Sequence, residues 1–128
     1  MNGPLTRNMH ELSIAMSIIE LAQEESERRR VQVSAVHLKL GALSGVVKEA
    51  LLGSFEMACE DTSLKGARLV IEELPVLIFC TGCGGHRPIR SVQLFCCADC
   101  GSPSGDIVQG KELEVVALEI EEWDRSPV

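Results

Sequence analysis

The chain has 128 residues and a formal net charge of −7 at pH 7, with 45% hydrophobic residues but only three Phe, one Trp and no Tyr. This length is enough for one ordinary domain, or a modest domain with a smaller module, and the core must be filled mainly by Val, Leu and Ile. The acidic balance opposes nucleic-acid binding, which relies on a basic surface, and no segment is apolar for long enough to span a bilayer.

The chain is predicted to begin with an amphipathic helix. Asn8 followed by Glu11 resembles a capping box, so the helix is expected to begin near Asn8. The charged residues 24–30 place cations in the last turn, which predicts that the helix ends near Arg30. The apolar residues at helical spacing, which predict the buried face, are Leu12, Ala15, Met16, Ile19 and Ala22.

Alternating and helical patterns then follow one another. Residues 36–40 alternate apolar and polar side chains, which predicts a strand that ends at Gly41. Helical spacing returns over residues 47–58 and predicts a second helix, which residues 61–63 close. Residues 67–74 are typical of another strand, and Pro75 marks its exit.

Two CxxC motifs, each followed by glycine, are the strongest signal in the chain. Their cysteines are Cys80 with Cys83 and Cys97 with Cys100. This spacing lets pairs of thiolates converge on one ion while backbone amides point at the sulfurs, and four soft ligands select zinc or iron. Cys96 is expected to be a spare thiol, and Cys59 a small core residue.

The alternative is that the four cysteines form two disulfides in a secreted module, which requires an oxidising compartment. The opening residues 1–8 are polar and lack the apolar core of a signal peptide, which opposes that alternative. The sequence therefore favours a metal site.

A third strand is predicted near the end of the chain, where residues 116–120 alternate apolar and other side chains. The element order predicts an α+β fold, a small α/β sandwich in which two helices pack on a three-stranded mixed sheet with an inserted zinc-ribbon module. The expected division is an N-terminal extension over residues 1–8, an α/β domain over 9–77 and 106–124, and the ribbon over 78–105.

His10 is the one histidine for which a chemical role is considered. Amides at the opening of a helix lack partners within it, so imidazole and backbone nitrogens could together hold a metal. His37 and His86 are interpreted as ordinary polar residues, because the four cysteines already fill a tetrahedral site. No Ser/His/Asp arrangement, phosphate-binding glycine loop or paired-carboxylate motif indicates an enzyme.

The Met9-His10-Glu11 head, Leu38-Lys39-Leu40-Gly41, the paired CxxC motifs and the final strand together resemble the HypA/HybF family, nickel metallochaperones of hydrogenase maturation. The resemblance runs from Met9 to about Glu122 in one order. It implies that Cys80, Cys83, Cys97 and Cys100 hold a structural zinc. It also implies that His10 with Glu11 binds nickel as transferred cargo.

One departure from the family concerns the nickel site. Family members usually begin at the Met of the head motif, so that the terminal amine joins the imidazole and two amides around square-planar nickel, whereas here eight residues precede Met9. This leaves open whether the native start is Met9 or another group supplies the fourth donor. Val47 stands where some relatives offer an acidic side chain, and Glu49 lies nearby.

The resulting functional prediction is a cytoplasmic nickel carrier without catalysis of its own. The resemblance implies a nickel-insertion GTPase and a hydrogenase large subunit as partners. The acidic charge and the lack of a long apolar segment predict that neither nucleic acid nor a membrane is a partner, and a homodimer is left open. One alternative is a rubredoxin-like single-iron electron-transfer protein, which would be coloured. The other is a zinc-ribbon module that binds nucleic acid, which the acidic balance opposes.

Overall fold

The computed structural model describes residues 3–122, with side chains described from His10 onward. The chain divides into two compact units. The first comprises residues 1–38, 46–72 and 115–128, and the second residues 39–45 and 73–114. The elements in chain order are α1 Gly3–Arg29, β1 Val31–Gly41, α2 Lys48–Cys59, β2 Arg68–Leu74, β3 Leu77–Cys80, β4 Gly85–Ser91, β5 Leu94–Cys97, β6 Ile107–Gln109 and β7 Leu113–Glu122.

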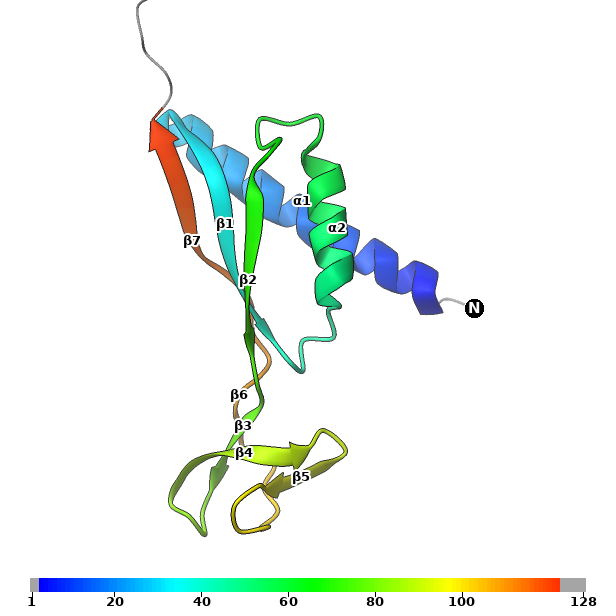
Figure 1. Ribbon diagram of the computed structural model, residues 1–128, viewed down its shortest axis with the longest axis vertical. Coiled ribbons are helices and arrows are strands. Elements are labelled where there is room, and N and C mark those ends of the chain that lie inside the picture. The colour runs from blue at the N-terminus through cyan, green and yellow to red at the C-terminus, as the bar shows by residue number, and fades with distance from the viewer. Residues whose placement is uncertain (1–2, 123–128) are drawn as a thin grey trace, which may run out of the picture. The chain divides into compact units, whose positions relative to one another are not determined.

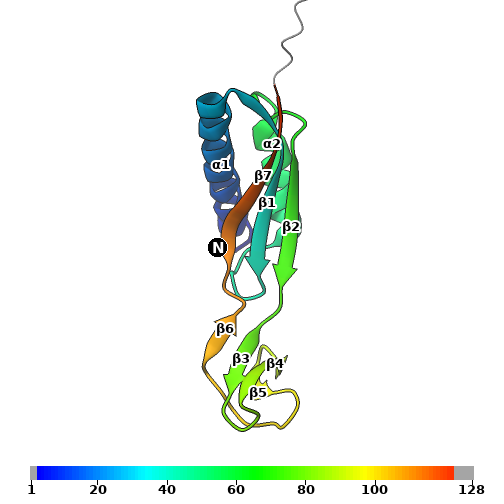
Figure 2. The same ribbon diagram turned by 90° about the vertical axis from the view of Figure 1, so that its left-hand side faces the viewer.

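The first unit is built on a three-stranded sheet with the strand order β2-β1-β7. β1 and β2 run in the same direction and β7 runs against them, so the sheet is mixed (Figure 1). Both helices lie on one face of this sheet, and neither covers the other face (Figure 2). The predicted α+β fold, with two helices on a three-stranded mixed sheet, is therefore confirmed.

The core of this unit lies between the helices and the sheet and is aliphatic, as the composition predicts. Met16, expected on the buried face of α1, is instead 58% exposed, and Ile18 takes a core position. Cys59 is a core residue as expected, and burial raises the pKa of its thiol to about 11. The buried core residues are Ala15, Ile18, Ile19, Ala22, Val33, Val36, Leu38, Leu51, Phe55, Cys59, Leu64 and Leu69.

α1 is longer at its start than the sequence predicts. It begins at Gly3 rather than near Asn8, and Pro4 is compatible with this because proline is tolerated in the first turn of a helix. The predicted end is confirmed, since Arg30 adopts a left-handed conformation with φ of 57° and turns the chain into β1. Neither α1 nor α2 is long and apolar enough to cross a membrane.

The second unit contains a four-stranded sheet with the order β5-β4-β3-β6. The sequence predicted a metal ribbon at this point, but not its individual strands. β3 pairs with β4 from Leu77 opposite Pro88 to Cys80 opposite Gly85, and β4 pairs with β5 at Ile89 opposite Cys97. The buried cluster around the cysteines consists of Ile78, Cys80 and Cys97, and Leu40 and Val76 are buried elsewhere in this unit. So small a set of buried apolar residues gives the unit little stability by packing alone.

Gly41 ends β1 at a close backbone approach within the second unit. Its amide donates to the Glu112 carbonyl at 2.7 Å, and the Leu43 amide donates to the Gly110 carbonyl at 2.6 Å. A Cβ on Gly41 would lie 2.1 Å from the Gly110 carbonyl oxygen, which no side chain can tolerate. The glycine of the Leu38-Lys39-Leu40-Gly41 motif is therefore required by packing.

Candidate metal centre

The four cysteines of the CxxC motifs converge at one point of the ribbon. The sulfurs of Cys80, Cys83, Cys97 and Cys100 all lie within 4.8 Å of one another. Sγ of Cys80 is 3.5 Å from Sγ of Cys100, and Sγ of Cys83 is 3.9 Å from Sγ of Cys97. A tetrahedron with zinc–sulfur bonds of about 2.3 Å has sulfur–sulfur edges of about 3.8 Å, so these positions fit a zinc ion.

Backbone groups of both knuckles point at the sulfurs, as the motif predicts. The Cys83 amide lies 3.4 Å from Sγ of Cys80, and the Asp99 and Cys100 amides lie 3.4 Å and 3.5 Å from Sγ of Cys97. Gly84 and Gly101 follow the knuckles with φ of 74° and 81°, in the left-handed region that glycine adopts without strain. The backbone of both knuckles therefore places amide groups where they can donate hydrogen bonds to thiolate sulfurs.

The cysteines of the cluster shift one another's pKa values. The hydrogen bond between Sγ of Cys100 and Oγ of Ser102, which lie 3.3 Å apart, is the main reason that the pKa of Cys100 falls to about 6. The adjacent Cys100 is in turn the main reason that the pKa of Cys83 rises to about 12. The thiol of Cys100 therefore loses its proton readily, and the neighbouring thiol of Cys83 then resists losing its own. A bound divalent cation would remove this conflict, because it favours every thiolate at once.

Two arginines of β4 contact the second knuckle. Arg90 Nε lies 3.4 Å from the Cys97 carbonyl oxygen, and Arg87 Nε forms an ion pair with Asp99 at 3.2 Å. Neither these arginines nor Ser102 were among the site residues predicted from the sequence. The only sequence signal for Ser102 is its position directly after the knuckle glycine. The only signal for the arginines is their position between the two CxxC motifs, where a hairpin must turn back.

The expected nickel residues lie next to each other in the chain but in different surroundings. His10 is exposed, whereas Glu11 is fully buried. Glu11 Oε2 accepts a hydrogen bond from the Val47 amide at 2.9 Å, while its Oε1 has no hydrogen-bond partner among the described residues. Because α1 begins at Gly3, the amide of His10 lies beyond the first helical turn and not at an open helix end. The assignment of nickel to these residues stays a prediction.

Glu11 also compensates for a missing cap on α2. Val47 is the N-cap residue of α2 and makes no side-chain capping bond. A carboxylate at this end of a helix is stabilised by the helix dipole. The burial of Glu11 was not predicted from the sequence, although its spacing to Ala15, Ile18 and Ala22 places it on the same stripe of α1.

The other two histidines lie outside the cysteine cluster, as predicted. Nε2 of His37 is paired with Oε2 of Glu119 at 2.5 Å, across β1 and β7. Arg68 of β2 reaches the other oxygen of the same carboxylate at 3.3 Å. His86 lies edge-on to Phe79, with ring centroids 6.3 Å apart. These contacts are consistent with a structural role for both histidines.

A four-thiolate cluster on an inserted ribbon, joined to a small α+β unit, defines a metal-binding protein of the zinc-ribbon type. The family model described as "Hydrogenase/urease nickel incorporation, metallochaperone, hypA" matches residues 9–120. The chain therefore belongs to the HypA family, and the resemblance found in the sequence is confirmed.

Relatives and solved structures agree with this assignment. A hydrogenase maturation factor HypA from Chloroflexus aurantiacus is 50% identical over 112 residues, which cover 87% of this chain and 98% of the relative. One from Geobacter metallireducens is 44% identical over 113 residues, which cover 88% of this chain and all of the relative. The solution structure of the nickel metallochaperone HypA from Helicobacter pylori is 25% identical with a TM-score of 0.59, covering 88% of this chain and 98% of that one.

Proposed function

We propose that this chain binds Ni(II) and delivers it to the large subunit during [NiFe] hydrogenase maturation. The observation that carries the proposal is the family match, which begins at Met9 and runs through both cysteine pairs to residue 120. The same chain combines the Met9-His10-Glu11 head with a four-sulfur cluster, so cargo and structural metal have separate candidate sites.

In this proposal, Cys80, Cys83, Cys97 and Cys100 hold a structural zinc. Four protein ligands leave no open coordination position, which is typical of structural and not catalytic zinc. The described core of the ribbon is small, so metal binding contributes much of its folding free energy. Iron in the same site would give strong visible absorption, whereas zinc has a filled d shell and is colourless.

Nickel is assigned to His10 together with nearby backbone nitrogens. Imidazole and deprotonated amides favour the square-planar geometry that Ni(II) accepts. The amides near His10 belong to a continuous helix, so binding of this kind requires the first turns of α1 to unwind. Glu11 is held by the Val47 amide, which confines the unwinding to residues before it. An exposed histidine on a segment that can refold also permits release.

The domains and partners follow from the same reasoning. Residues 9–77 and 106–124 form the nickel-binding domain, residues 78–105 the zinc ribbon, and residues 1–8 an extension. A nickel-insertion GTPase acts with the chain, which has no catalysis of its own. Reduced cysteines in a metal cluster suit the cytoplasm, where thiols are kept reduced.

Delivery can be tested by mixing nickel-loaded protein with a metal-free hydrogenase large subunit and the GTPase partner, and then measuring nickel in the separated large subunit. The proposal expects transfer to exceed that from free nickel held at the same concentration by a chelator. Equal transfer from chelator and protein would show that the chain does not deliver the metal.

A further inference from the structure

One edge of the three-stranded sheet is open along β7. In the order β2-β1-β7, β7 has a neighbour on one side only. No backbone hydrogen bond joins residues 115–122 to any described residue outside the sheet pairing. An edge of this kind presents unpaired N–H and C=O groups to another extended chain.

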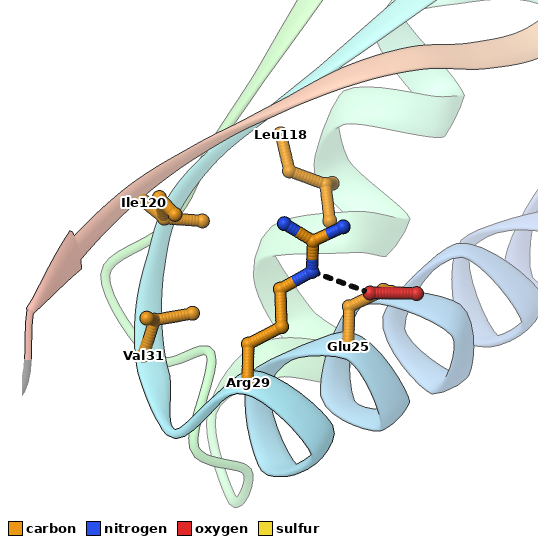
Figure 3. Close-up of a pocket in the computed structure, with 5 residues that line it drawn as sticks. All are labelled: Glu25, Arg29, Val31, Leu118 and Ile120. Carbon is orange, nitrogen blue, oxygen red and sulfur yellow. Dashed lines mark hydrogen bonds and ion pairs between the residues drawn. The ribbon is translucent and has the colours of Figure 1, made fainter.

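A pocket of about 200 Å³ lies beside this edge, on the helix side of the sheet. Figure 3 shows that Leu118 and Ile120 of β7 and Val31 of β1 face it, with Arg29 and Glu25 rising from the last turns of α1. Val116 and Ile120 are each 47% exposed, although both are large and apolar. A strand added beside β7 could place apolar side chains over this surface.

The charge along β7 indicates the chemistry of that strand. Glu121 and Glu122 are exposed and form no ion pair with any described residue, whereas Glu119 is paired with His37 and Arg68. Arg29, which lines the pocket together with Ile120, is paired with Glu25 and not with either of these glutamates. An incoming strand with basic residues would therefore gain cross-strand ion pairs.

A second copy of this chain is a poor occupant for the same reason. Pairing of two β7 edges would gather Glu119, Glu121 and Glu122 from both copies along one seam, and like charges across a strand pair are destabilising. We propose that residues 115–122 of β7, with the adjoining pocket, bind an extended segment of a partner protein that alternates apolar and basic residues and adds a fourth strand to the sheet.

The probe for this surface is a synthetic peptide that matches β7 in length and alternates valine with lysine. The expected result is saturable binding with amide shifts confined to β7 and to the pocket residues in NMR spectra of the zinc-loaded protein. A second peptide with proline in place of alternate valines should not bind, because proline cannot supply the strand hydrogen bonds. Failure of the first peptide to bind, or equal binding of the second, would overturn the proposal.

Charge reversal distinguishes specific binding of the peptide at the β7 edge from a general attraction of the peptide to an acidic protein. The double substitution Glu121→Lys with Glu122→Lys should weaken binding of the lysine peptide about tenfold. The matched control is Glu20→Lys with Glu24→Lys on the exposed face of α1, which makes the same change in net charge and should leave affinity nearly unchanged. Equal losses in both variants, or dimerisation of the wild-type chain through β7 in place of peptide binding, would contradict the proposal.

Discussion

The carboxylate of Glu11 on α1 accepts a hydrogen bond from the backbone amide of Val47 at 2.9 Å, and so fastens the head of the first helix to the N-terminus of α2. The side chain of Glu11 is completely buried, and its second oxygen finds no hydrogen-bond partner in the part of the chain that the structure describes. The residue beside the exposed His10 is therefore an anchor in this conformation. Any rearrangement of the head around a metal has to start from this fixed point.

Glu11→Ala should lower the free energy of unfolding by about 2–3 kcal/mol, because it leaves the Val47 amide without an acceptor and opens a cavity. Glu11→Gln should cost less, since an amide oxygen can still accept that bond. Thermal unfolding followed by circular dichroism measures both. Glu20→Ala, on the exposed face of the same helix, is the control and should have little effect. An Ala variant at position 11 as stable as the wild type would show that the anchor contributes nothing.

Gly41→Ala should destabilise the protein by more than about 2 kcal/mol, because the new methyl group would lie 2.1 Å from the Gly110 carbonyl oxygen. Gly53→Ala is the matched control. It lies within α2 with nothing within 4 Å of the added Cβ, so it should stabilise the protein by up to about 1 kcal/mol. Denaturant unfolding gives both values, and changes of the same sign would refute this packing argument.

Cys97→Ser should lose zinc or bind it poorly, whereas Cys96→Ser should keep it. Cys97 is a member of the four-sulfur group, and Cys96 is not, although the two residues are adjacent. Metal analysis of the purified variants measures the difference, with a zinc content of one per chain expected for the wild type and for Cys96→Ser. The reverse pattern would mean that the second knuckle uses a different register.

Stability should depend on pH through Glu119. Its hydrogen bond to His37, assisted by the charge of Arg68, holds the pKa of this carboxyl below its usual range. A lowered pKa in the folded state contributes stability that is present above the unfolded pKa, about 4.3, and is lost as pH falls through the folded value. Glu119→Gln should therefore lower the melting temperature near neutral pH, and the difference from wild type should shrink as the pH falls below the unfolded pKa and then through the lowered folded pKa. A difference that stays constant with pH would contradict this explanation.

Much of the architecture could be predicted from local patterns. The order of helices and strands in the first unit follows from apolar spacing, because each element buries one face, and the cysteine spacing predicts the four-sulfur group. The placement of Met16 was wrong, because the stripe that α1 buries follows Ala15, Ile18 and Ala22 at helical spacing, and Met16 lies outside this stripe. The early start of α1 was not predicted, because Asn8 and Glu11 resemble a capping box and so indicate a helix start at Asn8, whereas the helix continues through both residues.

Contacts between distant segments could not be predicted in the same way. The burial of Glu11 depends on the start of α2, which lies 36 residues further along the chain. The arginines beside the second knuckle act through the β4–β5 pairing, whose register the sequence does not specify. These features depend on tertiary packing, which brings polar groups together without leaving a periodic signal.

The length of the segment before His10 should affect nickel binding. If the terminal amine is a ligand, a protein that begins at Met9 should bind Ni(II) more tightly than the 128-residue chain, because it gains a donor and has fewer helical residues to unwind. Calorimetric titration of both proteins measures this difference. Equal affinities would show that another group, such as Glu11, supplies the remaining donor.

The most direct test of the carrier function is a calorimetric titration of zinc-loaded His10→Ala with Ni(II), beside the wild type and His37→Ala. His37 is already paired with Glu119, so its replacement should leave nickel binding intact. The account predicts that His10→Ala abolishes specific nickel binding while zinc content and helical content stay unchanged. Nickel binding by His10→Ala with the affinity of the wild type would contradict it.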